Sequence, residues 1–377
     1  MKLFTCPSCR SLVFFENVKC TQCGHALAFL PDRAVMSALE PVDASLYIAL
    51  APTAGGARYR LCANSVQHAV CNWAVPEASP DELCFACSFN EVIPNLSDPN
   101  ALEAWHRLEL AKRRLFYTLM TLELPLLPRA RDPRGLGFAF KRDGDNGEKV
   151  TTGHADGLVT INIAEADHAA RERLREHLHE TYRTLLGHFR HEVGHYYWAR
   201  LVDGSPSLEP FRALFGDERA DYGAAMNRHY EIGAPADWQV RHVSAYATMH
   251  PWEDWAETWA HYCHIVDTLE TARGYGLALR PAPVGGRPGR RATRRLRPLR
   301  RPDHGVVSAH ARAQQPQPQR GSPRSLSLRA LDGGGREAAL RPRRDRAAVL
   351  IGPRFLAPEP LRDIVPLWRS PTGSGRA

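Results

Sequence analysis

The sequence predicts an α+β protein in three parts: a small cysteine-rich β region over residues 1–93, a mostly helical domain over 94–279, and a basic low-complexity tail over 280–377. Three observations support this division. Eight of the nine cysteines fall within the first 87 residues, and apolar residues recur at helical spacing in the middle of the chain. The tail is rich in Arg, Pro and Gly and has no periodicity.

The charge of the chain is unevenly distributed. Residues 280–377 contain 22 Arg and six acidic residues, whereas residues 1–279 contain 27 basic and 35 acidic residues. A nucleic-acid partner predicted from the net charge of +8 would therefore have to bind the tail.

No apolar run approaches the roughly 18 residues of a membrane-spanning helix, and the first residues lack the apolar core of a secretory signal. We therefore expect a cytoplasmic protein without a membrane partner.

The first four cysteines form two pairs with the spacing of metal-binding knuckles. The pairs read CPSC and CTQC and are separated by ten residues. One short knuckle lets two thiolates bind one ion, and two knuckles complete a tetrahedral shell of sulfur ligands. We therefore predict a structural zinc site; the alternatives are free thiols or redox pairs. Its ligands would be Cys6, Cys9, Cys20 and Cys23.

The next four cysteines predict a second structural zinc site, with less regular spacing. Only Cys84 and Cys87, in CFAC, have knuckle spacing, whereas Cys62 and Cys71 are separated by eight residues. The alternative is that some of these thiols are simply buried. Structural zinc contributes folding free energy to segments that are too small to fold by an apolar core alone.

The middle of the chain predicts helices and two strands. A helix should begin at Asn100, which can cap it, and the segments GLGFAFKRD and GLVTINIAE have the composition of strands. We expect DGDNG between them to form a hairpin turn. Further helices are expected from Asp167 to about Arg200, near 208–230, and from Trp252 to Ala272.

The tail beyond about Arg280 has the composition of a disordered segment, because it combines Arg without Lys with Pro, Gly, Ala and Ser. Reading a GC-rich gene out of frame gives the same composition. One hypothesis is therefore a frameshift, which resequencing of the locus and peptide mass spectrometry would test. The alternative is an Arg-rich arm that binds nucleic acid.

The expected helix near residue 190 contains HFRHEVGHYYW, which includes an H-E-x-x-H motif. His191 and His195 are four residues apart, so on a helix their imidazoles share one face and can bind one ion. Glu192 lies beside them and can act as a general base toward water. A less specific interpretation is a polar, partly solvated helix face. His188, one turn earlier, is expected to pack or to support the site.

A catalytic zinc needs a third protein ligand, and two later segments could supply it. In HPWEDWAETWAHY, Glu253 and Glu257 are four residues apart, and in FGDERADYGAAM, Asp217 and Asp221 have the same spacing. The first carboxylate of such a pair can bind zinc while the second orients a histidine ligand. Asp221 could instead cap a helix. The spacing alone leaves Glu253 and Asp217 open as third ligands.

These motifs resemble those of known metallopeptidases. H-E-x-x-H followed by a helix with E-x-x-x-D/E is similar to the gluzincins, and EDWAE with Tyr246 seven residues before Glu253 is similar to the catalytic end of anthrax lethal factor. More broadly, residues 1–280 resemble a bacterial family of zinc-binding metallopeptidases with an N-terminal zinc ribbon. The segments that carry this resemblance are YRLCAN, CNW, HFRHEVGHYYW, LFGDERADY and HPWEDWAETWAHY. Beyond about Arg280 the sequence departs from that family.

The resemblance implies a zincin-like fold for the helical domain and a role for each site residue. Glu192 would be the general base and then the proton donor to the leaving amine, and Tyr246 would donate a hydrogen bond to the oxyanion. GLVTINI could supply the edge strand along which an extended peptide lies. The zinc ligands would be His191, His195 and Glu253, with Glu257 and Asp221 as supporting carboxylates.

We therefore expect a zinc-dependent metallopeptidase that holds one catalytic zinc and one or two structural zinc ions and acts on a peptide or protein. The alternative is a zinc-ribbon module that binds nucleic acid or protein and carries an inactive zincin-like domain. A third interpretation is an inactive product of a frameshifted gene. A dense basic patch would favour the second, but the basic residues of the ribbon region are scattered. The sequence indicates neither the cleavage specificity nor the oligomeric state.

Overall fold

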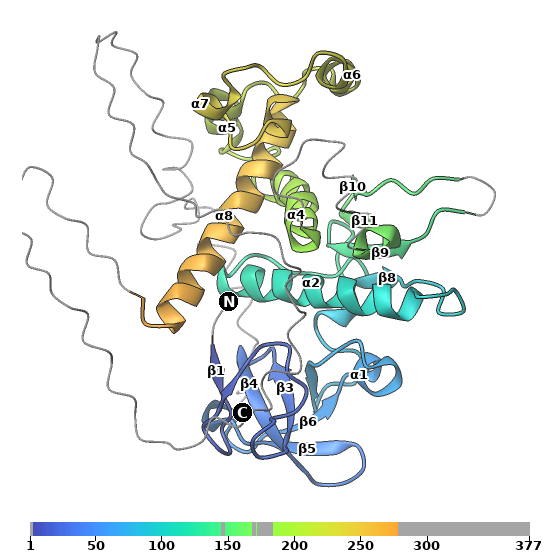
Figure 1. The fold of residues 1–377 in the computed structure, drawn as a ribbon, viewed down its shortest axis with the longest axis vertical. Coiled ribbons are helices and arrows are strands. Elements are labelled where there is room, and N and C mark those ends of the chain that lie inside the picture. Colours follow the sequence, from blue (N-terminus) through green and yellow to red (C-terminus); the bar gives the residue numbers. More distant parts are fainter. Residues whose placement is uncertain (1–2, 145–147, 168–170, 172–183, 278–377) are drawn as a thin grey trace, which may run out of the picture. The chain divides into compact units, whose positions relative to one another are not determined.

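The computed structural model describes residues 3–144, 148–167, 171 and 184–277, all of which belong to one compact unit. Figure 1 shows an N-terminal region of short strands followed by a helical region, which confirms the predicted α+β class. The tail predicted from residue 280 lies outside the described residues. Within the described ranges, no helix has both the length and the apolar character needed to cross a membrane.

The cysteine-rich region is built from short antiparallel strands. β1 (Phe4–Thr5) pairs with β2 (Leu12–Val13), and the CPSC knuckle occupies the loop between them. α1 (Ala63–His68) connects the last two strands of a five-stranded sheet. That sheet follows chain order and consists of β3 (Ala26–Leu30), β4 (Val35–Pro41), β5 (Leu46–Ala49), β6 (Arg58–Leu61) and β7 (Ala74–Pro76).

A second sheet has four strands in the spatial order β10-β11-β9-β8. Its strands are β8 (Asn90–Val92), β9 (Gly137–Lys141), β10 (Gly153–Ala155) and β11 (Leu158–Asn162). β9 and β11 are the two strands that the sequence predicted. They pair in parallel, which requires a crossover connection, so the expected hairpin from β9 directly to β11 is wrong. Residues 145–147 of DGDNG lie outside the described residues.

The hairpin of this sheet lies instead between β10 and β11, where Asp156 and Gly157 form the turn. Both residues have positive φ angles, 47° and 81°, the backbone conformation that Asp-Gly favours in two-residue hairpin turns. Because β11 is covered by β9 and β10, GLVTINI is not the edge strand that was expected. The edge strand on this side of the sheet is β10.

The helices are α2 (Ala101–Thr121), α4 (Leu185–Leu201), α5 (Leu208–Phe215), α6 (Tyr222–Ile232), α7 (Trp238–Arg241) and α8 (Pro251–Gly274). α2 begins after Asn100 as predicted, but the Asn100 side chain makes no capping hydrogen bond. α4 begins after Thr184, whose hydroxyl accepts a hydrogen bond from the Gly187 amide at 2.9 Å. One continuous helix from Asp167 to about Arg200 is therefore wrong, since Thr184 has extended backbone. Residues 168–170 and 172–183 of that expected helix lie outside the described residues. The helix expected near 208–230 is also two helices: α5 ends at Phe215, Gly216 follows with a φ angle of 105°, and α6 begins at Tyr222.

One apolar core joins the strands of the cysteine-rich region to the helices. On one side of α2, the ring of Tyr117 lies 5.4 Å from Phe15 and 6.3 Å from Phe4. The preceding residue, Phe116, lies 4.7 Å from Phe89, and α2 also packs against α4. The core therefore crosses the predicted boundary at residues 93–94, and α2 is the element that connects its two halves.

Arg190, which precedes the motif on α4, carries a buried charge. Its side chain is 1% exposed, forms an ion pair with Asp267 on α8, and lies 3.4 Å from the Thr118 hydroxyl on α2. Three helices therefore share one polar contact inside the core.

We expect Asp267→Ala to lower the free energy of unfolding by about 3–5 kcal/mol, because it leaves the Arg190 guanidinium buried without its carboxylate. Urea unfolding followed by circular dichroism measures the change. The matched control is Asp237→Ala, which breaks the exposed pair with Arg241 on α7 and should cost at most about 1 kcal/mol. Equal losses in both variants would contradict a structural role for the buried pair.

Candidate metal centres and active site

The H-E-x-x-H motif lies on α4, and α8 runs beside it (Figure 1). Gly194, the fourth residue of the motif, lies at their contact. A Cβ atom at this position would be 3.1 Å from the Cα of Ala256, closer than most side-chain contacts. The Trp255 indole donates a hydrogen bond to the Gly194 carbonyl at 2.8 Å. The small residue therefore lets α8 approach α4 closely enough to bring its carboxylates to the motif histidines.

Three side chains converge between these helices: His191, His195 and Glu253. The two histidine Nε2 atoms are 3.2 Å apart. The carboxylate oxygens of Glu253 lie 2.9 Å from His191 Nε2 and 3.4 Å from His195 Nε2. Ligand atoms around a tetrahedral zinc are about 3.3 Å apart, so this spacing fits a zinc ion.

Glu253 also has the polar atom that a metal would satisfy. Its side chain is 2% exposed, and its Oε2 atom makes no hydrogen bond in the described part of the chain. Oε2 lies 2.9 Å from His191 Nε2, and a cation bound by both atoms would offset the cost of burying the carboxylate. The residues present therefore fit a zinc ion.

Glu257 lies one turn after Glu253 and contacts the other ring nitrogen of His191, at 2.7 Å from Nδ1. Burial would raise the pKa of Glu257, but the hydrogen bond from His191 outweighs burial and lowers that pKa to about 2. A carboxylate at Nδ1 fixes the ring orientation and leaves Nε2 for the metal. His188, by contrast, is paired with Glu165.

Tyr246 and Glu192 lie close to this group. Tyr246 is in a short 3₁₀ turn, Tyr246–Thr248, and its ring centroid is 6.0 Å from that of His191. Burial, followed by the negative charge of Glu253, raises the pKa of Tyr246 above its usual value. The side chain therefore stays a hydroxyl that can donate a hydrogen bond. Glu192 is buried on α4 between the two histidines.

The other pair of carboxylates is used differently. Both oxygens of Asp217 lie 2.8 Å from guanidinium nitrogens of Arg219, an exposed pair that is not part of the ligand group. Asp221 accepts a hydrogen bond from the Ala224 amide at 2.9 Å and caps α6. Of the two roles considered for Asp221, the structure therefore shows the helix cap.

The sequence did not single out Tyr222 or His154, although the structure places both at the site, together with Trp252. The Tyr222 hydroxyl donates a hydrogen bond to Glu253 Oε1 at 2.9 Å. Trp252 and His154 flank the ring of His195, with centroids at 4.0 and 6.5 Å. Tyr222 is the last residue of the segment LFGDERADY, in which only the carboxylates Asp217 and Asp221 were predicted to have a role.

The eight N-terminal cysteines form the two predicted groups, and within each group the sulfur atoms lie within 4.8 Å of one another. The Cys6–Cys23, Cys9–Cys20 and Cys71–Cys84 pairs are each separated by 3.6 Å. Four sulfurs around one zinc are about 3.8 Å apart, so both groups fit a zinc ion. The second group is fully buried; its members are Cys62, Cys71, Cys84 and Cys87.

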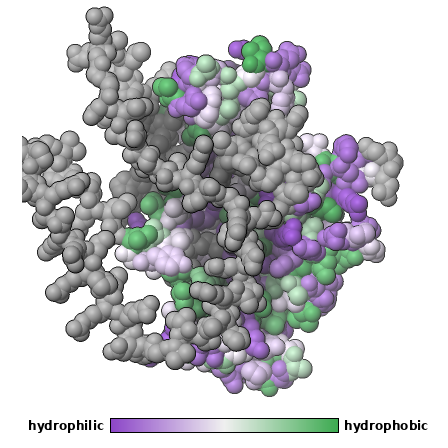
Figure 2. Space-filling model, viewed as in Figure 1, coloured by the Kyte–Doolittle hydropathy of each residue, from purple (hydrophilic) through white to green (hydrophobic). Residues whose placement is uncertain are grey.

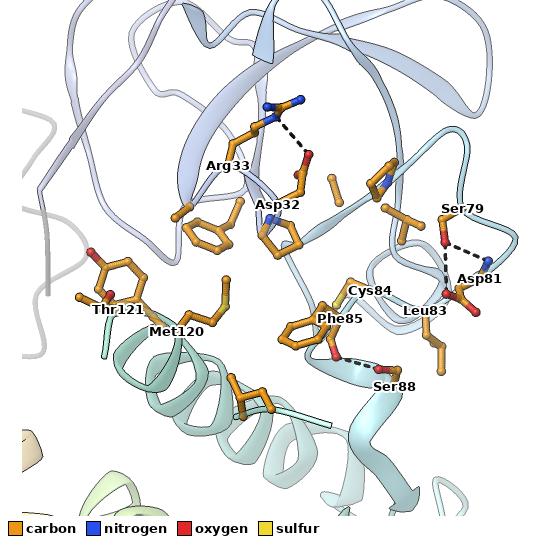
Figure 3. Close-up of a pocket in the computed structure, with 18 of the residues that line it drawn as sticks. Asp32, Arg33, Ser79, Asp81, Leu83, Cys84, Phe85, Ser88, Met120 and Thr121 are labelled. Atoms are coloured by element: carbon orange, nitrogen blue, oxygen red, sulfur yellow. Dashed lines mark hydrogen bonds and ion pairs between the residues drawn. The ribbon is translucent and has the colours of Figure 1, made fainter. Parts of the chain in front are cut away.

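A cavity of about 1060 Å³ lies between the five-stranded sheet and the C-terminal end of α2 (Figure 3). Apolar side chains form most of its wall, and none of the zinc-ligand candidates on α4 and α8 lines it. Polar groups at the cavity pair with their neighbours: Arg33 lies 3.2 Å from Asp32, and the Ser79 hydroxyl lies 3.2 Å from Asp81. We assign no reaction to this cavity.

Comparison with known proteins agrees with this geometry. A profile of the family described as "Putative zinc-binding metallo-peptidase" matches residues 101–312, and a zinc-ribbon domain matches residues 3–98. The uncharacterized proteins Mb2598c of Mycobacterium bovis and Rv2568c of Mycobacterium tuberculosis are each 46% identical to this chain over 279 residues. The aligned part covers 74% of this chain and 77% of each relative. No solved structure matches the chain. The chain therefore belongs to this family of zinc-binding metallo-peptidases and carries a zinc-ribbon domain before the peptidase region.

Proposed function

We propose that this protein is a zinc-dependent metallopeptidase that hydrolyses peptide bonds in a peptide or protein substrate. One observation carries the proposal: the ligand atoms of His191, His195 and Glu253 lie 2.9–3.4 Å apart on two packed helices, with Glu192 beside them. This is the donor set of a catalytic zinc with an adjacent general base. The two cysteine groups would hold structural zinc ions.

A zinc ion in this site would supply a Lewis acid that lowers the pKa of water toward neutrality. Glu192 would accept the proton from the attacking water and then deliver it to the leaving amine. Glu257 holds the ring of His191 through its Nδ1 atom. Tyr246 would donate a hydrogen bond to the oxyanion, an interaction that strengthens as negative charge develops there.

The edge strand β10 packs against α4 and offers a backbone edge for an extended substrate. In this arrangement the peptide would lie along residues 153–155 rather than along GLVTINI. Clustered free thiols are typical of metal ligands in a reducing compartment, which supports our proposal of a cytoplasmic location.

The alternative of a nucleic-acid-binding ribbon receives less support. Arg33 and Arg58 are paired with Asp32 and Glu77, at 3.2 and 3.4 Å. Arg60 donates a hydrogen bond to the Ser79 carbonyl at 2.6 Å. These three arginines are engaged with the protein itself, which leaves them less available to bind phosphates.

We expect Glu192→Gln to reduce the rate of peptide hydrolysis by about 10²–10⁴-fold, because the amide cannot accept the proton of the attacking water. Cleavage of a fluorogenic peptide library by the full chain measures this rate, and mass spectrometry measures the zinc content in parallel. The zinc content should stay unchanged. Glu209→Gln, at an exposed position on α5, is the matched control and should keep full activity. A Glu192→Gln variant as active as the wild type would refute the proposed mechanism.

A further inference from the structure

We propose that Tyr222 is a positioning residue that holds the carboxylate of Glu253 in place for the metal. This role rests on the proposed zinc site and adds to it a residue from a different helix, α6. Tyr222 donates its hydroxyl hydrogen to Glu253 Oε1 at 2.9 Å. We expect Tyr222 to act on zinc affinity through Glu253 and not as a ligand itself.

The two oxygens of Glu253 have different surroundings. Oε1 receives the hydrogen bond from Tyr222 and lies 3.4 Å from His195 Nε2, whereas Oε2 lies 2.9 Å from His191 Nε2. The side chain is almost fully buried, so the orientation of the carboxylate depends on these protein neighbours. A neutral donor on Oε1 fixes the plane of the carboxylate without neutralising its charge. Each oxygen thereby stays beside the Nε2 atom of one histidine, where a shared metal ion would bind.

Several contacts fix Tyr222 itself. Asp221 caps the first turn of α6 directly before it. His250 accepts a hydrogen bond from the Trp252 amide at Nδ1, so its Nε2 carries the proton and donates it to the Ala220 carbonyl at 3.0 Å. The Tyr222 ring lies 5.2 Å from His250 and 6.3 Å from Trp252. The start of α6 is thereby tied to the first turn of α8, which carries Glu253.

The surroundings of α6 indicate that Tyr222 does not serve the core. α6 has no buried residue, and Tyr222 itself is 37% exposed. Figure 2 shows this part of the molecule, at the top of the view, as a mixed surface in which hydrophobic patches alternate with hydrophilic ones. The segment from Asp217 to Tyr222 therefore contributes to the site through the Tyr222 hydroxyl, which it positions at Glu253, and not through its carboxylates.

The test measures zinc affinity in Tyr222→Phe, which keeps the ring and removes the hydroxyl. Equilibrium dialysis of the full chain against zinc, with a chelator that strips only the site on α4 and α8, gives the dissociation constant. We expect affinity to fall by about 10–100-fold, the range measured when groups that orient metal ligands are removed. Tyr230→Phe, on the same helix and more exposed, is the matched control and should bind zinc as the wild type does.

If Tyr222 acts through Glu253, the effect of Tyr222→Phe on zinc affinity should depend on the presence of Glu253. In a Glu253→Ala background, whose weaker binding is followed into the millimolar range, Tyr222→Phe should cause no further loss. An unchanged affinity in the single variant, or an equal loss in both backgrounds, would overturn the proposal. His195→Ala separates this result from the proposed function: if that variant loses no zinc, the zinc site itself is wrong. If it loses zinc while Tyr222→Phe does not, only the role of Tyr222 fails.

Discussion

The purified full chain should contain about three zinc ions, and His195→Ala should contain about two, because three separate groups of side chains have the donors and spacing of a zinc site. Removing one of three ligands leaves two donors, which cannot hold zinc against a chelator, whereas the cysteine groups keep all of theirs. Inductively coupled plasma mass spectrometry gives the zinc content, and amino-acid analysis gives the protein concentration.

Matched controls separate the site from its surroundings. Glu253→Ala should lose the same ion as His195→Ala, whereas Asp217→Ala should lose none, because Asp217 is paired with Arg219. His261→Ala, on α8 beside the site, should also keep all three ions, since His261 contacts the Glu257 carbonyl. If His195→Ala kept three ions, the motif would not bind metal. If Asp217→Ala lost one, Asp217 would be the third ligand.

The sequence predicted those features that short-range spacing encodes. Cysteine pairs two residues apart and histidines four apart on a helix bring donors together whatever the rest of the chain does. Glu253 and Glu257 followed from the same helical rule, and the structure places them at Nε2 and Nδ1 of His191. The choice between Glu253 and Asp217 did not follow, because both segments have the same internal spacing. Tertiary packing at Gly194 brings α8 to the motif.

Features that depend on distant contacts were missed or wrong. The pairing of β9 with β11 is parallel, and no local pattern distinguishes that pairing from a hairpin across DGDNG. The contact of Tyr222 with Glu253 joins residues 31 positions apart in the chain. Tyr246 was found only because a resemblance supplied its offset from Glu253.

Composition did not fix where the tail begins. The family match reaches residue 312 and so includes residues that composition assigned to the tail. The frameshift there remains a prediction for resequencing.

The second cysteine group lies inside the core that α2 organises. Cys71 is two residues from Trp73, whose ring lies 4.7 Å from Phe29, and Cys87 is two residues from Phe89, which lies 4.7 Å from Phe116 on α2. The Cys84 amide donates a hydrogen bond to the Cys62 sulfur at 3.3 Å, which supports a thiolate there. Loss of this zinc would therefore remove the packing of the ribbon against α2 as well as the metal site itself.

We expect Cys84→Ser to unfold the helical region together with the ribbon. Structural zinc contributes roughly 10–16 kcal/mol of folding free energy in small zinc domains, which is as large as the roughly 5–15 kcal/mol stability of a typical protein. Far-UV circular dichroism and resistance of α4 and α8 to proteolysis measure the outcome, with a large loss of helical signal expected.

Cys263→Ser is the matched control, because Cys263 is buried on α8 and belongs to no cysteine group. It should lower the free energy of unfolding by only about 1–3 kcal/mol, the cost of burying a hydroxyl without a partner. If Cys84→Ser lost one zinc and kept its helical signal, the two halves would fold independently. The boundary at residues 93–94 would then be a true domain boundary, and the shared core around α2 would be an interface between two domains rather than the centre of one.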